Sequence, residues 1–341
     1  MLREVICKHI KPRIVPFSYT TTASSASLSV GAGDLTVGRT GTAAVTLTAR
    51  EPFSRTGFIF CTPGSPATAG SYTRYSGDPS SKSAWSVDTL PEQGGSSVEG
   101  TVDGFLMGFD STDLSFCQSQ TVKSTLTSPR TIWGKITGST GAVAIGTRTF
   151  TCNKASTGVY TIKFTPAFGI TPVVLATGIS STVGVNCVVS AKSATGCTIS
   201  TTPASGVATD ADFYLVVMGQ DSRHDGGKNR SPLRNNQRDP RIVACDVNNT
   251  GGVYSLTVGG ATGGADFTTL TDTAAGDFSI TIASPFKREP AIIVMASSLR
   301  PAVSYSNSVI RVQVRNGTGT LSDTNGPIYV FVIGSDDASE Y

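Results

Sequence analysis

One phrase occurs three times in this sequence, and the repeat limits the possible folds more than any other feature. Each copy is an apolar run that stops at Gly, any residue, Asp: GFLMGFD at 104–110, FYLVVMGQD at 213–221 and IYVFVIGSD at 328–336. A phenylalanine precedes each terminal glycine by 48 to 55 residues, and these are Phe53, Phe168 and Phe286. Self-similarity at a regular period indicates tandem copies of one unit.

The spacing of the copies indicates their size. Phe53 and Phe168 are 115 residues apart, and Phe168 and Phe286 are 118 apart. A solenoid repeat is shorter, roughly 20–50 residues, whereas a unit of this length can hold its own core. A proline follows the phenylalanine by four residues in the last two copies, and Gly57 takes that place in the first; the prolines are Pro172 and Pro290.

Short β-prone runs fill the sequence between clusters of Gly, Asn, Asp, Ser and Pro. Examples are VYTIKF at 159–164, PVVLAT at 172–177, FSITI at 278–282 and AIIVMA at 291–296. Such runs are typical of many short antiparallel strands. We therefore expect an all-β fold: three tandem antiparallel β-sandwich, jelly-roll-like domains with an extended N-terminal arm.

The parts of the repeat have expected roles. The phenylalanine should close the end of the sandwich, and the proline should enter a strand that is covered on both faces. The glycine should let the chain turn, and the aspartate should accept hydrogen bonds from turn amides. A cation site is the alternative function for the aspartates, but no second carboxylate recurs beside all three; they are Asp110, Asp221 and Asp336.

The repeat divides the chain into six parts. These are an N-terminal docking arm at 1–17, a first sandwich at 18–110, a linker at 111–130, a second sandwich at 131–221, a basic linker at 222–240 and a third sandwich at 241–341. Three linked copies favour an extended, rigid body.

Two of these segments are candidates for docking on a partner. Apolar residues alternate with basic ones in the arm, and the expected contacts are Ile6, Ile10, Ile14 and Phe17. The basic linker would contribute Arg223, Arg230 and Arg234. This linker is either a solvated connection or a strap over an acidic surface of a neighbouring subunit.

Catalysis has little support in the sequence. The only histidines are His9 and His224, and neither lies in a motif with a nucleophile or with metal-ligand spacing. The Gly-rich stretch SVGAGD at 29–34 lacks the lysine and the helix of a phosphate loop. We expect no enzymatic activity and no cofactor or metal, although separated carboxylates could meet in a folded protein as in a glycosidase.

Seven cysteines are present and none forms a CxxC pair. Buried small apolar side chains are the simplest interpretation. Cys187 and Cys197 flank a predicted hairpin and could face each other across it. Cys7 and Cys117 lie in connecting segments, where we expect cross-links between subunits if the protein is oxidised after leaving the cytoplasm.

The charge and the apolar content of the chain limit its possible partners and location but do not indicate a function. The net charge of +3 is too small to indicate a nucleic-acid partner, and only 15% of residues are charged. No apolar stretch reaches the length of a signal peptide core or a membrane helix. We expect the protein to be made in a cytoplasm, without direct nucleic-acid or membrane contacts.

The phrase GVYTIKFTPAFGITPVVLAT, with the later strand ADFYLVVMG, resembles a module of tailed-bacteriophage virion proteins. That module recurs in tail, head and collar fibres and in decoration proteins, as small jelly-roll or C1q-like sandwiches that are often trimeric and lack enzymatic activity. The resemblance covers 131–221 and 245–337; the first copy departs from it at Gly57 and at 76–95.

The resemblance implies a non-enzymatic structural protein of a virion. It would be a decoration, collar or fibre protein anchored on the particle by other virion proteins. The family resemblance implies a homo-oligomer, with a trimer as the expected form. The alternative is a receptor- or glycan-binding tip of a tail fibre.

Overall fold

A computed structural model gives the structure of the chain. It describes residues 13–334 except for 42–43, 54–57, 65–71, 76–82, 91–98, 109–128, 148, 180–184, 204–206, 221–240, 251, 257–266, 288, 297–299, 316–319 and 324–325. The described residues form strands and connections, with no helix. None of them therefore forms a helix that is long and apolar enough to span a membrane.

The described residues form twenty-four strands, which fall into three sets of eight. The first set is β1 (Arg13–Thr21), β2 (Ala26–Val30), β3 (Leu35–Arg39), β4 (Ala44–Ala49), β5 (Phe58–Pro63), β6 (Tyr72–Tyr75), β7 (Ala84–Leu90) and β8 (Thr101–Gly108). The second is β9 (Pro129–Thr137), β10 (Ala142–Gly146), β11 (Phe150–Ser156), β12 (Val159–Phe164), β13 (Val173–Gly178), β14 (Val185–Ser193), β15 (Gly196–Pro203) and β16 (Phe213–Gln220). The third is β17 (Arg241–Thr250), β18 (Val253–Leu256), β19 (Phe267–Ala274), β20 (Asp277–Ile282), β21 (Ala291–Ala296), β22 (Arg300–Ser306), β23 (Val309–Arg315) and β24 (Gly326–Gly334).

Each set folds into two four-stranded antiparallel sheets with one shared topology. In the first domain the sheet orders are β2-β1-β8-β5 and β3-β4-β7-β6, and the same orders recur eight and sixteen strands later. We call the sheet that contains the first and last strands of a domain its inner sheet, and the other its outer sheet. The predicted all-β fold of three antiparallel sandwiches is confirmed.

The recurring phenylalanines occupy one place in all three domains. Phe53, Phe168 and Phe286 each lie four residues after the end of β4, β12 or β20, and all three are buried. They also explain the recurring glycine. A Cβ atom on Gly219 would lie 2.7 Å from the Phe168 ring, and one on Gly334 would lie 2.8 Å from the Phe286 ring.

The glycine therefore makes room for the aromatic ring. Gly219 and Gly334 have no positive φ, and the residue before each still pairs within its sheet. The prediction that this glycine serves a turn is wrong for these two copies. The aspartates that follow lie outside the described residues.

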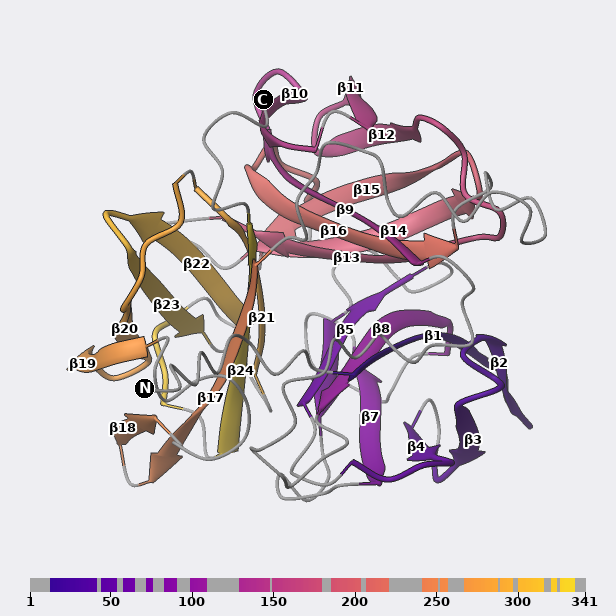
Figure 1. Ribbon diagram of the computed structural model, residues 1–341, viewed down its shortest axis with the longest axis horizontal. Coiled ribbons are helices and arrows are strands. Elements are labelled where there is room, and N and C mark those ends of the chain that lie inside the picture. The colour runs from indigo at the N-terminus through magenta and orange to yellow at the C-terminus, as the bar shows by residue number, and fades with distance from the viewer. Residues whose placement is uncertain are drawn as a thin grey trace, which may run out of the picture.

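The three sandwiches surround a common axis, with their inner sheets facing the centre (Figure 1). The contacts repeat in cyclic order: β13 packs against β8 and β1, β21 packs against β16 and β9, and β5 packs against β24. Two parallel bridges also repeat, joining Gly64 to Val189 and Ile179 to Val303. Because the contacts form a closed ring, the expectation of an extended body is wrong.

The ring explains the apolar strands that were expected to be covered on both faces. In β16, Phe213, Leu215 and Val217 belong to the core of the second sandwich. The alternating residues Tyr214 and Val216 instead join one apolar cluster with residues of the first and third domains. Side chains alternate between the faces of a strand, so one face of β16 fills its own domain and the other fills the centre.

The predicted N-terminal arm needs a correction. Residues 13–17 form the start of β1 and pair with β8, from Arg13 opposite Gly108 to Phe17 opposite Gly104. Ile14 and Phe17 are buried in the shared cluster, so they are core residues and not docking residues. A short apolar run is equally typical of a strand buried on both faces, and residues 14–19 of this strand are all buried.

Candidate functional site at the three-domain axis

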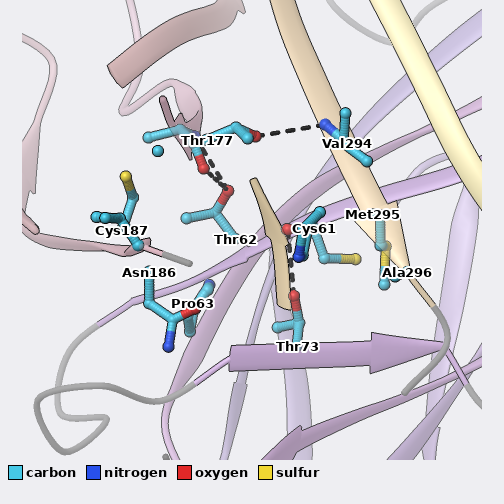
Figure 2. Close-up of a pocket in the computed structure, with 14 residues that line it drawn as sticks. Cys61, Thr62, Pro63, Thr73, Thr177, Asn186, Cys187, Val294, Met295 and Ala296 are labelled. Atoms are coloured by element: carbon cyan, nitrogen blue, oxygen red, sulfur yellow. Dashed lines mark hydrogen bonds between the residues drawn. The ribbon is translucent and has the colours of Figure 1, made fainter. Parts of the chain in front are cut away.

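A small pocket lies between the three domains, beside the last residues of β5, β13 and β21 (Figure 2). Its volume is about 50 Å³, which is room for one or two water molecules. Its lining comes from all three domains: Cys61, Thr62, Pro63, Thr73, Ala176, Thr177, Gly178, Val185, Asn186, Cys187, Val294, Met295, Ala296 and Pro301.

Threonine hydroxyls join adjacent domains beside this pocket. The Ala176 amide donates a hydrogen bond to Thr62 Oγ1 at 3.1 Å, and the Val294 amide donates to Thr177 Oγ1 at 3.4 Å. Thr62 and Thr177 are equivalent, since each lies nine residues after the recurring phenylalanine. Met295 holds the third such position, and its thioether cannot donate a hydrogen bond and is only a weak acceptor.

A buried ion pair joins the first domain to the second. Asp103 of β8 is 1% exposed, and it pairs with Lys192 of β14. Its second oxygen accepts a hydrogen bond from the Val174 amide at 3.2 Å, and Lys192 also donates to Ser18 Oγ at 3.2 Å. Burial raises the pKa of Asp103 above its ordinary value, while Lys192, Ser18 and the Val174 amide act to lower it.

The backbone of β14 is irregular just before Lys192. The register of β14 against β15 shifts between Ser190 and Ser193, and Ala191 has a φ of 44°. Residues other than glycine seldom adopt a positive φ, because Cβ then crowds the backbone. Bulges change the direction of side chains, and this one accompanies the lysine that reaches the first domain.

A second polar contact joins the second domain to the third. Glu289 of the third domain accepts hydrogen bonds from Tyr214 Oη at 2.5 Å and from Lys135 Nζ at 2.8 Å. Tyr214 lies five residues before Gly219, as Asp103 lies five before Gly108, and the strand partners of the two are Lys135 and Ser18. On the inner sheets the two polar contacts therefore occupy equivalent positions, whereas Lys192 of β14 and Glu289 before β21 reach them from different parts of the neighbouring domain.

The contact between the third and first domains is aromatic. The ring of Phe331 lies 4.7 Å from that of Phe105 and 5.5 Å from that of Phe60, measured between centroids. Tyr329 also lies against Phe60, at 6.2 Å. Phe105 and Phe331 are equivalent residues, and Val216 holds their place in the second domain.

Cys61, Cys152, Cys187 and Cys197 are free thiols, so Cys187 and Cys197 do not form a disulfide with each other. The predicted hairpin forms, but Cys187 lies opposite Thr201, about four positions along the strand from Cys197. At a rise of about 3.3 Å per residue this separates them by about 13 Å, which is too far for a disulfide. Burial raises the pKa of Cys187 to about 12, so it remains a thiol at neutral pH.

The other predicted site residues lie outside the described part of the chain. These are Ile6, Ile10, Cys7, Cys117, Arg223, Arg230, Arg234 and the three recurring aspartates. Among the described residues, no group of three or more His, Cys, Asp and Glu could hold a metal ion.

Sequence reasoning missed the polar contacts between domains, although one signal was present. Asp103 is an acidic residue inside the apolar strand TVDGFLMG, and such a residue needs a partner when it is buried. Neither Lys192 nor Glu289 stands out in its own segment. The pairs are visible only once the domains are placed around the axis.

Comparison with known proteins identifies no relative of this chain: no family model, no curated protein and no solved structure matches it.

Proposed function

We propose that this protein is a non-enzymatic structural component of a tailed-phage virion, anchored on the particle as a decoration, collar or fibre protein. The observation that carries the proposal is the shared apolar cluster, which joins buried residues of all three sandwiches into one body. A single packed body suits a structural surface component. The resemblance of residues 158–177 to virion modules supports the same assignment.

The proposal includes the partners and the location of the protein. Other virion proteins would hold it, after assembly in the host cytoplasm, with no direct nucleic-acid or membrane contact. The resemblance associates such modules with homotrimers, and this chain already groups three sandwiches within itself. Its own oligomeric state is best measured by light scattering on purified protein.

The test is to add purified protein to particles that lack it and, separately, to host cells. Saturable binding to the deficient particles, with electron cryo-microscopy density at a fixed place on them, is the expected result. Tight binding to cells without binding to particles would favour a receptor- or glycan-binding tip.

Two truncations refine the test of the proposed arm. Deleting residues 1–12 leaves β1 intact, so the protein should fold, and docking through Ile6 and Ile10 predicts that it no longer joins particles. Deleting residues 1–17 removes part of β1 and should disrupt the first sandwich. Normal incorporation of the shorter deletion would contradict docking through the arm.

A further inference from the structure

The two polar contacts between domains have opposite polarity. At the first contact, the inner sheet of the first domain supplies the anion Asp103 and the second domain supplies the cation Lys192. At the second contact, the inner sheet of the second domain supplies the cation Lys135 and the third domain supplies the anion Glu289. Asp103 is equivalent to Tyr214, and its strand partner Ser18 is equivalent to Lys135, so the inner-sheet charge is reversed within one equivalent pair of strand positions.

We infer that these contacts specify which sandwich docks against which, so that the chain closes on itself in one order and does not exchange domains with a second copy. Three sandwiches of one topology could close around an axis in either cyclic order. They could also pair with domains of another chain, since exchange of equivalent domains is a common route to oligomers.

Wrong pairings would place like charges together. If the third domain docked on the first, Glu289 would lie near Asp103, which is equivalent to its present partner Tyr214. If the second domain of another chain docked on the second domain, Lys192 would approach Lys135. Juxtaposed like charges in a largely desolvated contact oppose association, and proteins use such repulsion to reject wrong partners.

Burial makes this discrimination effective. Asp103 is almost completely covered and is held by both Lys192 and the Val174 amide of the second domain. A carboxylate in this position that met no cation would be left buried and uncompensated. The side chains of Lys135 and Glu289 are only about one-fifth exposed, at 22% and 20%. Water therefore screens neither contact as it would screen a surface pair.

The test exchanges the polarity of one contact without removing it. In the double variant Lys135→Glu/Glu289→Lys, the second contact keeps an ion pair but acquires the polarity of the first. The native order remains favourable, whereas the third domain can now approach Asp103 with a lysine, and Lys192 of another chain can approach Glu at 135. The control Arg39→Glu/Glu99→Arg exchanges a pair that lies within the first domain.

The measurement is the fraction of mixed species after two differently tagged forms are unfolded and refolded together. One tag is captured and the other is detected, and the same forms mixed after folding give the background. We expect wild type and the control variant to stay at background, and the exchanged variant to rise at least threefold above it. A background level for the exchanged variant would overturn the inference.

A neutral variant covers the case in which the exchanged variant does not fold. It removes both charge pairs at once, so that no charge is left buried without its partner. Its four substitutions are Asp103→Asn, Lys192→Met, Lys135→Met and Glu289→Gln. This variant should also give mixed species above background after joint refolding. If it refolds without mixing, the contacts stabilise the ring but do not select the order of the domains.

Discussion

The contact between the first and second domains and the contact between the third and first domains share one backbone geometry but differ in chemistry. The former holds Asp103, Lys192 and the hydroxyl of Thr62, whereas the latter is built from Phe60, Phe105 and Phe331. In a homotrimer one set of residues must serve all three contacts. Here each contact has its own residues, so apolar attraction and polar selection are assigned to different places.

The largest effect should follow from truncation in the aromatic contact. Phe331→Ala removes a buried ring that packs against Phe60 and Phe105, and such changes cost about 3–5 kcal/mol in the free energy of unfolding. Val216→Ala is the matched control at the equivalent position. It should cost about 1.6 kcal/mol, at about 0.8 kcal/mol for each buried carbon lost.

Denaturant titration of both variants measures this difference. Because the aromatic cluster belongs to one core with the other domains, all three sandwiches should unfold in a single transition in the wild type. Equal losses for the two variants would show that the aromatic contact is no more stabilising than its equivalents.

A smaller effect should follow from removing a hydroxyl at the polar contact. Thr62→Val keeps the shape of the side chain but deprives the buried Ala176 amide of its acceptor, at a cost of about 1–3 kcal/mol. Met295→Leu is the matched change at the equivalent position of the other contact, and it should cost less than about 1.5 kcal/mol. A greater loss for Met295→Leu in the same titration would reverse the comparison.

The smallest effect should be a difference in pH dependence. Folding raises the pKa of Asp103 above its ordinary value of 3.8. The folded chain therefore holds the proton of the Asp103 carboxyl group more tightly than the unfolded chain does. The contribution of Asp103 to stability should therefore decrease as the pH rises from 3.8 through the raised pKa. The difference in free energy of unfolding between wild type and Asp103→Asn should follow this decrease.

Asp277 provides a control of opposite sign. Arg311 holds the pKa of Asp277 below its ordinary value of 3.8, so its stabilising contribution is present above that pH and is lost as the pH falls through the lowered pKa. Unfolding measured from about pH 3 to about pH 7 on Asp103→Asn and Asp277→Asn should show these two directions. The same direction for both variants would contradict the assignment for Asp103.

The sequence predicted the all-β fold better than the arrangement of the sheets. Phe53, Phe168 and Phe286 mark equivalent ends of strands, and the long apolar runs correctly indicated strands covered on both faces. The sequence did not show that neighbouring domains supply the second cover. Contacts such as Lys192 with Asp103 join residues 89 positions apart, and nothing local in either segment indicates the other.

The lack of local signals for long-range pairing also explains the wrong predictions at the N-terminus and in the hairpin. Ile14 and Phe17 lie in the apolar run IVPF, which fits both a docking segment and a buried strand, and the pairing of β1 with β8 decides between them. Cys187 and Cys197 flank the expected turn, but the position of the turn and its bulge fix the register. Both cases depend on which residues pair across strands, and composition does not determine that.

The closed ring has a consequence for how the protein responds to dilution. A trimer of separate chains dissociates as its concentration falls, whereas domains on one chain meet at an effective concentration that dilution does not change. The shared cluster therefore stays assembled in a single isolated molecule as it does in a concentrated solution. A protein that leaves a crowded cell and encounters its surroundings one molecule at a time would keep its three sandwiches together.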